Sequence, residues 1–308
     1  MLIAPFGAIT RANWVIIWSF LELRSFRFIS ILKKKNREER IKYFLVQTLG
    51  SITLLLCINL KINGNRTINI LNLFMPMLMI FSLALKRGVA PIHFWIPEIS
   101  RNIKIKSLGA FLSIQKLAPL FILINNCKIK IATIFIIFSI ILGTLRQLSS
   151  LNINILLSYS SVSHTRWIIL AGLLSNQMYF IYFSVYTIIL ILILYSLRKF
   201  NSSVLFRKDK TLSLILNLLS FRGVPPLLGF FPKWMVILSS ISWNRTKIIV
   251  FLLIVLSCIN IYIYIRIFTL KTVNEQEKEK EKKSYNKRFL LSSMLNFFPI
   301  SIFLFYIL

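Results

Sequence analysis

The chain contains one unusual proline-rich pattern twice, at positions 135 residues apart. The first copy, Arg-Gly-Val-x-Pro-x-x-x-Trp-x-Pro, begins at Arg87, and the second, which has Phe in place of Trp, begins at Arg222. The residues expected to shape these breaks are Gly88 and Pro91 in the first copy and Pro225, Pro226 and Pro232 in the second. Each copy follows or interrupts a long apolar run, so each predicts a broken helix that protein or water must enclose. Paired breaks of this kind are typical of transporters built from internal repeats, and we expect the chain to move an ion.

Composition identifies the class of protein. Hydrophobic residues make up 56% of the 308 positions, and the mean hydropathy of +0.74 is far above that of a soluble globular domain. The basic residues behind the net charge of +29 lie mostly in short polar gaps between apolar runs, a pattern that sets membrane topology. We therefore expect a polytopic membrane protein that does not bind nucleic acid.

Ten apolar runs of roughly 18 to 25 residues are long enough to cross a bilayer as helices. They lie at 13–32, 41–60, 68–86, 107–124, 130–148, 153–175, 178–199, 211–231, 246–268 and 288–308. The runs predict an all-α fold with one membrane domain over residues 1–308. Its parts are a stub at 1–12, repeat halves at 13–124 and 130–268, a polar loop at 269–287 and a C-terminal helix at 288–308. The stub is too short to span, and eleven spans are the alternative.

Positive charge predicts the orientation in the membrane. If the runs alternate, the gaps on one face carry about two dozen Lys and Arg, against about seven on the other. The more basic face is the inner one, which places the C-terminus outside.

Four ionisable residues are the candidates for proton transfer. Glu22 is the one acidic residue, among nine, that falls inside a predicted span. A charge at that depth is costly, so its partner is expected to be a buried lysine: Lys86, Lys116 or Lys233. A buried lysine can lose its proton, whereas arginine stays charged. These four residues predict a relay.

Alternative interpretations exist for the basic residues near the relay. Lys86 and Lys233 border loop-like segments, so their heads could instead extend to an interface. Lys116 is less able to reach an interface, because the run around it is apolar. In addition, Pro119 frees a backbone carbonyl, which can open a watered bend beside the ammonium. Arg24 and Arg27 are expected to extend to the basic face, although Glu22 could also pair with one of them.

Two histidines and three cysteines complete the set of reactive side chains. His164 shares a helical face with Ser160 and could hold a water chain, or it could be bonded within the bundle. His93 lies beside two aromatic residues and is expected to belong to an interfacial aromatic anchor. The cysteines stand far apart, and neither histidine has a second ligand nearby in sequence. The sequence therefore predicts no metal site and no redox cofactor.

Several segments together resemble the chain 2 family of mitochondrial NADH-ubiquinone oxidoreductase, an antiporter-like membrane subunit of respiratory complex I that is related to cation/proton antiporters. They are Trp18 to Glu22, Ile41 to Gln47, Lys86 to Glu98, Gln115 to Pro119, Leu157 to Trp167 and Gly223 to Trp234. The resemblance runs from about residue 14 to the end of the chain, and 178–220 and the part after 246 match only as apolar spans.

The resemblance implies a role for each candidate residue. Glu22 and Lys86 correspond to the glutamate-lysine pair of the family, Lys116 to the central lysine of a hydrated axis, and Lys233 to the terminal lysine at the second broken helix. His164 falls at a family histidine between two inverted repeats. Quinone reduction elsewhere in the complex would drive protons along this axis from the matrix to the intermembrane space.

The resemblance also implies a setting in the mitochondrial inner membrane. Its partners there are the other core and accessory subunits of the membrane arm, and the basic inner gaps suggest contacts with cardiolipin. NADH, FMN, iron-sulfur clusters and ubiquinone are expected elsewhere in the complex, so this chain would be a non-redox subunit without a catalytic site or bound cofactor of its own.

The chain departs from the family pattern at several charged positions. Arg166 and Arg222 stand where the family usually has glycine, and Arg24 and Arg27 occupy positions that are normally uncharged. The N-terminus is also shorter than the usual animal form. The main hypothesis is a proton-translocating subunit of complex I. The alternatives are a free-standing cation/proton antiporter and a structural spacer whose buried charges only hold helices together.

Overall fold

Regular structure in this protein is helical. The computed structural model describes residues 13–32, 37–63, 69–127, 129–148, 150, 152–198, 208–241 and 247–276. Within those ranges every regular element is an α-helix, which confirms the predicted fold class. The N-terminal stub and the helix predicted at 288–308 lie outside the described residues, so the total number of spans stays a prediction.

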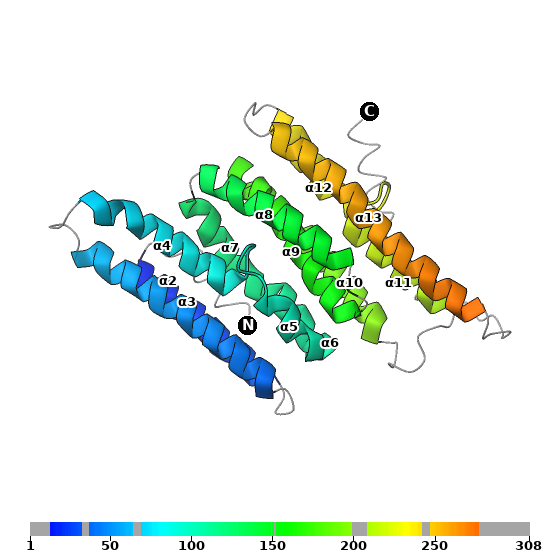
Figure 1. Cartoon of the computed structure of the whole chain (residues 1–308), viewed down its shortest axis with the longest axis horizontal. Helices are drawn as coiled ribbons and strands as arrows, with labels where there is room; N and C mark the ends of the chain where they lie inside the picture. Colours follow the sequence, from blue (N-terminus) through cyan, green and yellow to red (C-terminus); the bar gives the residue numbers. More distant parts are fainter. Residues whose placement is uncertain are drawn as a thin grey trace. The chain divides into compact units, whose positions relative to one another are not determined.

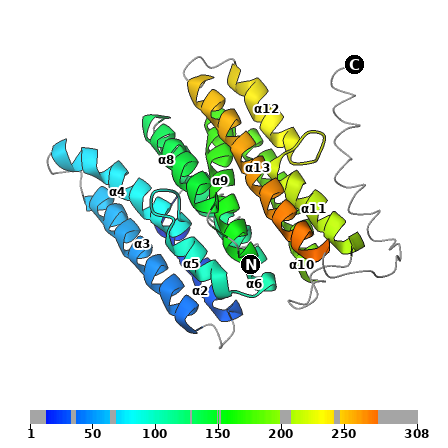
Figure 2. The same cartoon turned by 45° about the vertical axis from the view of Figure 1, so that its right-hand side comes forward.

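Contacts divide the chain into two compact units, Met1–Leu173 and Leu174–Leu308. Unit 1 holds α2 (Trp14–Ile31), α3 (Arg37–Asn63), α4 (Asn69–Arg87), α5 (Trp95–Asn102), α6 (Ile105–Leu112), α7 (Ile114–Asn126), α8 (Ile129–Leu148) and nearly all of α9 (Ile153–Leu174) (Figure 1). Unit 2 holds α10 (Asn176–Arg198), α11 (Lys208–Arg222), α12 (Phe230–Ile241) and α13 (Lys247–Gln276) (Figure 2). The sequence repeat places the junction of its halves between 124 and 130, whereas α8 and α9 belong by contact to unit 1.

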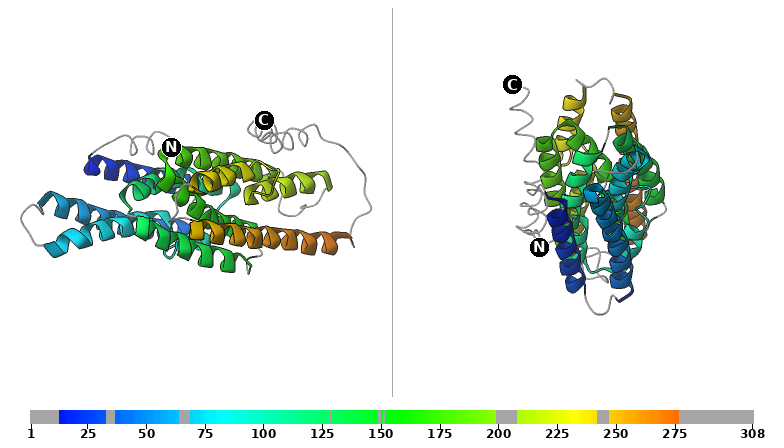
Figure 3. Two further views of the ribbon diagram at one scale, coloured as in Figure 1. Left: turned by 90° about the horizontal axis from the view of Figure 1, so that it is seen from above. Right: turned by 90° about the vertical axis from the view of Figure 1, so that its left-hand side faces the viewer.

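The helices of unit 1 pack around a buried aromatic cluster. Helices α3 and α4 run side by side, and α2 and α7 pack against this pair (Figure 3). The Phe28 ring of α2 lies 4.9 Å from the Tyr43 ring of α3 and 5.4 Å from the Phe111 ring of α6, measured between centroids. Trp95, the first residue of α5, lies 5.8 Å from Phe111 on the same measure. The cluster thus holds Trp95, where the chain becomes helical again after the first break, against side chains of α3 and α6.

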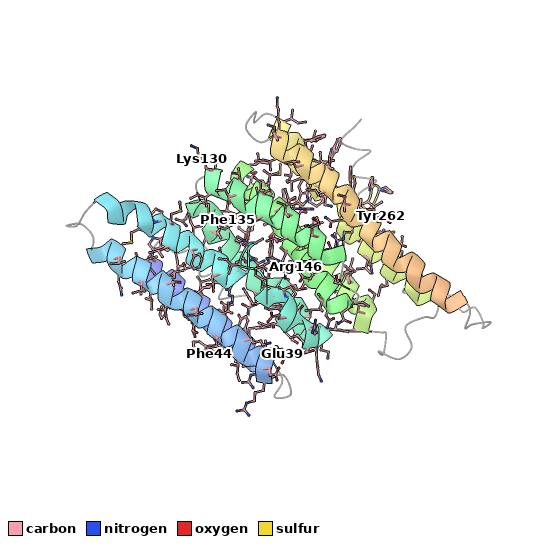
Figure 4. All side chains as sticks on the ribbon, viewed as in Figure 1. Glu39, Phe44, Lys130, Phe135, Arg146 and Tyr262 are labelled. Atoms are coloured by element: carbon pink, nitrogen blue, oxygen red, sulfur yellow. The ribbon has the colours of Figure 1, made fainter. Side chains whose placement is uncertain are left out.

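The outer faces of the helices are apolar, which is the reverse of a soluble protein. On α3 the exposed side chains form one stripe: Ile41, Phe44, Leu45, Leu49, Ile52, Leu56 and Leu60. Phe44 lies on the outer side of its helix (Figure 4). So large an apolar surface requires lipid or another chain to cover it.

Four stretches among the described residues are long and apolar enough to cross a membrane. They are Arg37–Leu60, Ile105–Asn126, Ile129–Gln147 and Asn176–Arg198. Together with the apolar outer faces, they support the expected polytopic membrane fold.

The repeated motif folds into a repeated backbone structure. Helix α4 ends at Arg87, and Gly88 follows with φ of +64°; α11 ends at Arg222, and Gly223 follows with φ of +73°. In both copies the glycine N–H and the next N–H donate back to carbonyls of the last helical turn, as in a Schellman motif. The distances are 3.2 and 3.1 Å in the first copy and 2.9 and 3.3 Å in the second. The Ala90-Pro91 and Pro225-Pro226 peptides are both cis.

Two predicted spans are not continuous helices. The run at 211–231 contains the second break, since α12 begins only at Phe230. The run at 107–124 is interrupted at Ser113, where φ is −107° and ψ is −82°, and α7 then continues through Pro119. The interruption therefore lies three residues before Lys116, whereas the sequence drew attention to Pro119.

Replacing Gly223 by Ala should destabilise the protein by about 1–2 kcal/mol, because an L-residue is strained in the left-handed region. A Cβ at this position would also lie 2.8 Å from the carbonyl oxygen of Gly229. Gly143→Ala is the matched control, since its Cβ would meet Ser163 at an ordinary 3.7 Å. Chemical denaturation in detergent measures both, and equal stability of the two variants would contradict the role of the glycine turn.

Candidate functional site

Glu22 and Lys86 form a buried ion pair in unit 1. Lys86 Nζ, in the last turn of α4, lies 2.7 Å from Glu22 Oε1 in the middle of α2. The Lys86 side chain is 1% exposed and that of Glu22 13%. The alternative in which Lys86 extends to an interface is therefore wrong, because the ammonium finds a carboxylate on the neighbouring helix.

Helix α3 holds the end of α4 in place. Gln47 Nε2 donates a hydrogen bond of 3.0 Å to the carbonyl of Lys86, which belongs to the last helical turn. Gly50, one turn along α3, leaves room for the lysine stem, since a Cβ there would lie 2.6 Å from Lys86 Cγ. The lysine that bears the charge is thus fixed through both its side chain and its backbone.

Lys116 lies at the start of α7 and is 2% exposed. Its Nζ donates a 2.5 Å hydrogen bond to Ser161 Oγ on α9, and Ser161 in turn donates to the carbonyl of Ser158 at 2.6 Å. The sequence directed attention to Ser160, but the Ser160 hydroxyl donates to Leu157 instead. Ser161 and His164 are three residues apart, a spacing that places them on one helical face and could have identified Ser161.

A small cavity lies between the two lysines, lined by both polar and apolar side chains. The volume open to the centre of a water molecule is about 10 Å³, which is about the minimum for one water molecule. Lys86 and Lys116 both line it, together with Arg87 and the polar side chains of Tyr43, Gln47 and Gln115. The structure thus brings three of the four predicted relay residues, Glu22, Lys86 and Lys116, into one buried cluster.

Arg24 is buried beside this cluster, at 1% exposure. Its Nη1 donates a 2.6 Å hydrogen bond to the carbonyl of Gln115. The expectation that Arg24 extends to the basic face is therefore wrong, whereas Arg27, one turn further along α2, is exposed. Pro119 frees the carbonyl of Gln115, and Arg24 binds this carbonyl. The guanidinium therefore supplies the hydrogen bond that the sequence analysis assigned to water at the bend.

Lys233 lies in unit 2, near the start of α12, and is 8% exposed. Its Nζ donates to the carbonyl of Arg222, the last residue of α11. Burial excludes the interfacial alternative for this lysine as well. Its hydrogen bond lies within unit 2, and its place in a relay with the cluster of unit 1 stays a prediction.

Both histidines are buried, and only His93 departs from the expectation. His164 is 6% exposed on α9, and its role in a water chain stays a prediction. His93 is 0% exposed, with Nδ1 3.2 Å from the carbonyl oxygen of Pro91 and its ring 6.2 Å from that of Tyr159. It is therefore no interfacial anchor. Its neighbour Phe94 is the exposed residue, with the Arg146 guanidinium 4.4 Å above the ring (Arg146 is labelled in Figure 4).

The remaining unusual charges are also buried. Arg166 is 1% exposed within α9, and Arg222 is 2% exposed at the end of α11. Among the described residues no group of three or more His, Cys, Asp and Glu has a geometry that could hold a metal ion.

Comparison of the sequence with known proteins gives a consistent family. A family model described as NADH:quinone oxidoreductase/Mrp antiporter, TM, matches residues 12–260. NADH-ubiquinone oxidoreductase chain 2 of Anopheles gambiae is 32% identical over 273 residues, which cover 84% of this chain and 80% of that protein. The chain 2 of Hylobates lar is 35% identical over 277 residues, covering 83% and 79%.

Solved structures show the same fold. A chain of respiratory complex I from Thermus thermophilus, with bound aureothin, has a TM-score of 0.71 at 19% identity, covering 85% of this chain and 66% of its own. A chain of the Mrp complex from Dietzia sp. DQ12-45-1b has a TM-score of 0.73 at 15% identity, covering 86% and 58%. The present chain is thus similar to less than two thirds of either solved chain.

Replacing Lys86 by Met should destabilise the protein by about 3 kcal/mol, because removing one member of a buried pair leaves the other charge without its partner. Lys42→Met is the matched control, since Lys42 pairs with Glu98 at 3.8 Å and both side chains are more than half exposed. That surface pair is worth about 0–1 kcal/mol.

Denaturation in detergent compares the two lysine variants. A further change of Glu22 to Gln should recover part of the loss in the Lys86→Met background, because it removes the unpaired carboxylate. Equal losses of stability for Lys86→Met and Lys42→Met would show that the buried pair stabilises the protein no more than the surface pair does.

Proposed function

The chain belongs to the NADH:quinone oxidoreductase/Mrp antiporter family of membrane proteins, and we propose that it translocates protons in respiratory complex I through the Glu22, Lys86 and Lys116 cluster. Its similarity to NADH-ubiquinone oxidoreductase chain 2 supports a proton-translocating membrane-arm subunit of a multi-subunit complex in the mitochondrial inner membrane. The complex I assignment is favoured over a free-standing antiporter. Its relatives at 32–35% identity are complex I subunits, whereas the likeness to the Mrp chain, at 15% identity, concerns the fold alone.

The observation that carries the proposed relay is the Glu22–Lys86 ion pair beside a cavity that Lys116 also lines. A buried ammonium is stable while a carboxylate faces it. If a change elsewhere in the complex draws the carboxylate away or neutralises it, the charged form of Lys86 loses its main support. The proton can then pass through one water in the cavity toward Lys116.

Ser161 provides the next step from Lys116. Its hydroxyl accepts a hydrogen bond from Lys116 Nζ and donates its own proton to the carbonyl of Ser158, so it can pass a proton on once the hydroxyl turns away from that carbonyl. His164 lies one turn further along the same face of α9 and can continue the path. Lys233 then serves as the terminal group of the relay, in agreement with its position at the second break.

The chemistry of electron transfer belongs to other subunits under this proposal. NADH, FMN, iron-sulfur clusters and ubiquinone are bound elsewhere, and this chain contributes charge movement to the NADH:ubiquinone reductase without a catalytic site of its own. Its C-terminus faces the intermembrane space, its partners include core and accessory membrane-arm subunits, and its basic matrix-facing gaps contact anionic lipids such as cardiolipin.

Replacing Lys116 by Met should lower proton pumping by the assembled complex by about a hundredfold or more, because the variant has no group that can carry the proton. Lys130→Met is the matched control, since Lys130 is exposed on α8 (Figure 4). Pumping is measured in proteoliposomes during NADH oxidation by a quinone. Co-purification of the variant chain with the NADH-oxidising complex confirms assembly.

Two results would contradict the proposed function. Undiminished pumping by an assembled Lys116→Met complex would favour a structural spacer. Cation/proton exchange by the isolated chain in liposomes, without association with an NADH-oxidising complex, would favour a free-standing antiporter.

Replacing Ser161 by Ala should lower pumping-coupled turnover about tenfold, because a hydrogen bond to a charged group is lost. Ser160→Ala is the matched control: the neighbouring hydroxyl is equally buried but donates to the carbonyl of Leu157. The turnover of both variants is compared in the assembled complex. Similar rates would place Ser161 outside the path.

A further inference from the structure

Arg24 is a buried cation that the relay leaves unexplained. It lies on α2, two residues after Glu22, and is 1% exposed, whereas Arg27 on the same helix is exposed. Arginine does not give up its proton in proteins, so Arg24 cannot carry one. Its contacts must therefore explain why a charge is kept at this depth.

Two hydrogen bonds join Arg24 to one residue of α7. Arg24 Nη1 donates to the Gln115 carbonyl at 2.6 Å, and Gln115 Nε2 donates back to the Arg24 carbonyl at 3.3 Å. Tyr43 donates to Gln115 Oε1 at 3.2 Å from α3. Gln115 is thus bonded through its backbone and through both ends of its side chain, by groups from two other helices.

The backbone near Gln115 has a specific need for such a partner. Pro119 has no N–H, so the Gln115 carbonyl lacks the donor that the fourth residue along a helix normally supplies. The helix is also interrupted at Ser113, just before this turn. The turn that carries Lys116 is therefore flanked by an interruption on one side and a missing hydrogen bond on the other.

We propose that Arg24 is a positioning residue of the relay: its guanidinium binds the carbonyl that Pro119 leaves open and thereby fixes the turn that carries Lys116. This inference rests on the proposed function of Lys116. The bond is charge-assisted and short, so it holds the carbonyl more firmly than an exchanging water would. Gln115, the residue that Arg24 binds, lines the cavity that Lys86 and Lys116 also line.

A double-mutant cycle tests this pairing directly. Arg24→Leu removes the guanidinium, and Pro119→Ala restores a backbone N–H that can donate to the Gln115 carbonyl within α7. Arg24→Leu alone should lower pumping-coupled turnover about tenfold, since small misplacements of a reacting group cost about that much or more. In the Pro119→Ala background the same change should cost less than about threefold, because the carbonyl then has an internal donor.

Arg27→Leu is the matched control, since it removes the same charge from the exposed part of the same helix. It should leave turnover unchanged. Arg24→Lys should recover part of the activity, because an ammonium can still donate to the carbonyl, and the KM for quinone should stay constant throughout. If Arg24→Leu does not assemble, assembly of the Arg24→Leu/Pro119→Ala complex decides: recovery supports the pairing, and failure overturns it.

Additive losses in the cycle, or equal effects of Arg24→Leu and Arg27→Leu, would overturn the inference. The Lys116→Met complex separates this failure from a failure of the relay. If Lys116→Met pumps normally, the relay itself is wrong. If Lys116→Met is inactive while Arg24→Leu behaves like Arg27→Leu, the relay stands and only the role of Arg24 is lost.

Discussion

The structure depends on one constraint: where a helix is interrupted at membrane depth, the freed carbonyl must find a donor within the protein. Two helix ends and one proline within a helix meet this need in the same way in the described residues, through a long polar side chain from another element. Gln47, Arg24 and Lys233 donate to the carbonyls of Lys86, Gln115 and Arg222, respectively. The residues that close the backbone are therefore the neighbours of the proposed relay, or members of it.

The three lysines of the proposed relay donate to three different kinds of acceptor. Lys116 donates to a hydroxyl, which can pass a proton on, whereas Lys233 donates to a backbone carbonyl, which accepts a hydrogen bond but carries no proton. Lys86 differs again, because a carboxylate faces it. In the proposed relay, the charge of Lys86 would thus depend on the position of Glu22.

Much of the fold and part of the site could be predicted from the sequence. The paired breaks were predictable because proline and a left-handed glycine restrict the backbone locally. The sequence alone predicted that Glu22 pairs with a buried lysine, because a carboxylate at membrane depth needs a cation, but it left three lysines open, and only the family resemblance implied Lys86. Arg24 and His93 were mispredicted, since a long cation or an aromatic-flanked histidine usually reaches an interface, and only packing shows that both are enclosed.

The sequence by itself determined that this chain is a helical membrane protein with two matching breaks and a small set of buried charges, because hydropathy, proline and glycine act over a few residues. Only the tertiary structure decided which donor closes which carbonyl and that Ser161, not Ser160, faces Lys116. The reason is physical: a backbone carbonyl is present at every residue and leaves no mark in the sequence. Its partner is selected by how neighbouring helices approach and rotate, which depends on contacts far apart along the chain.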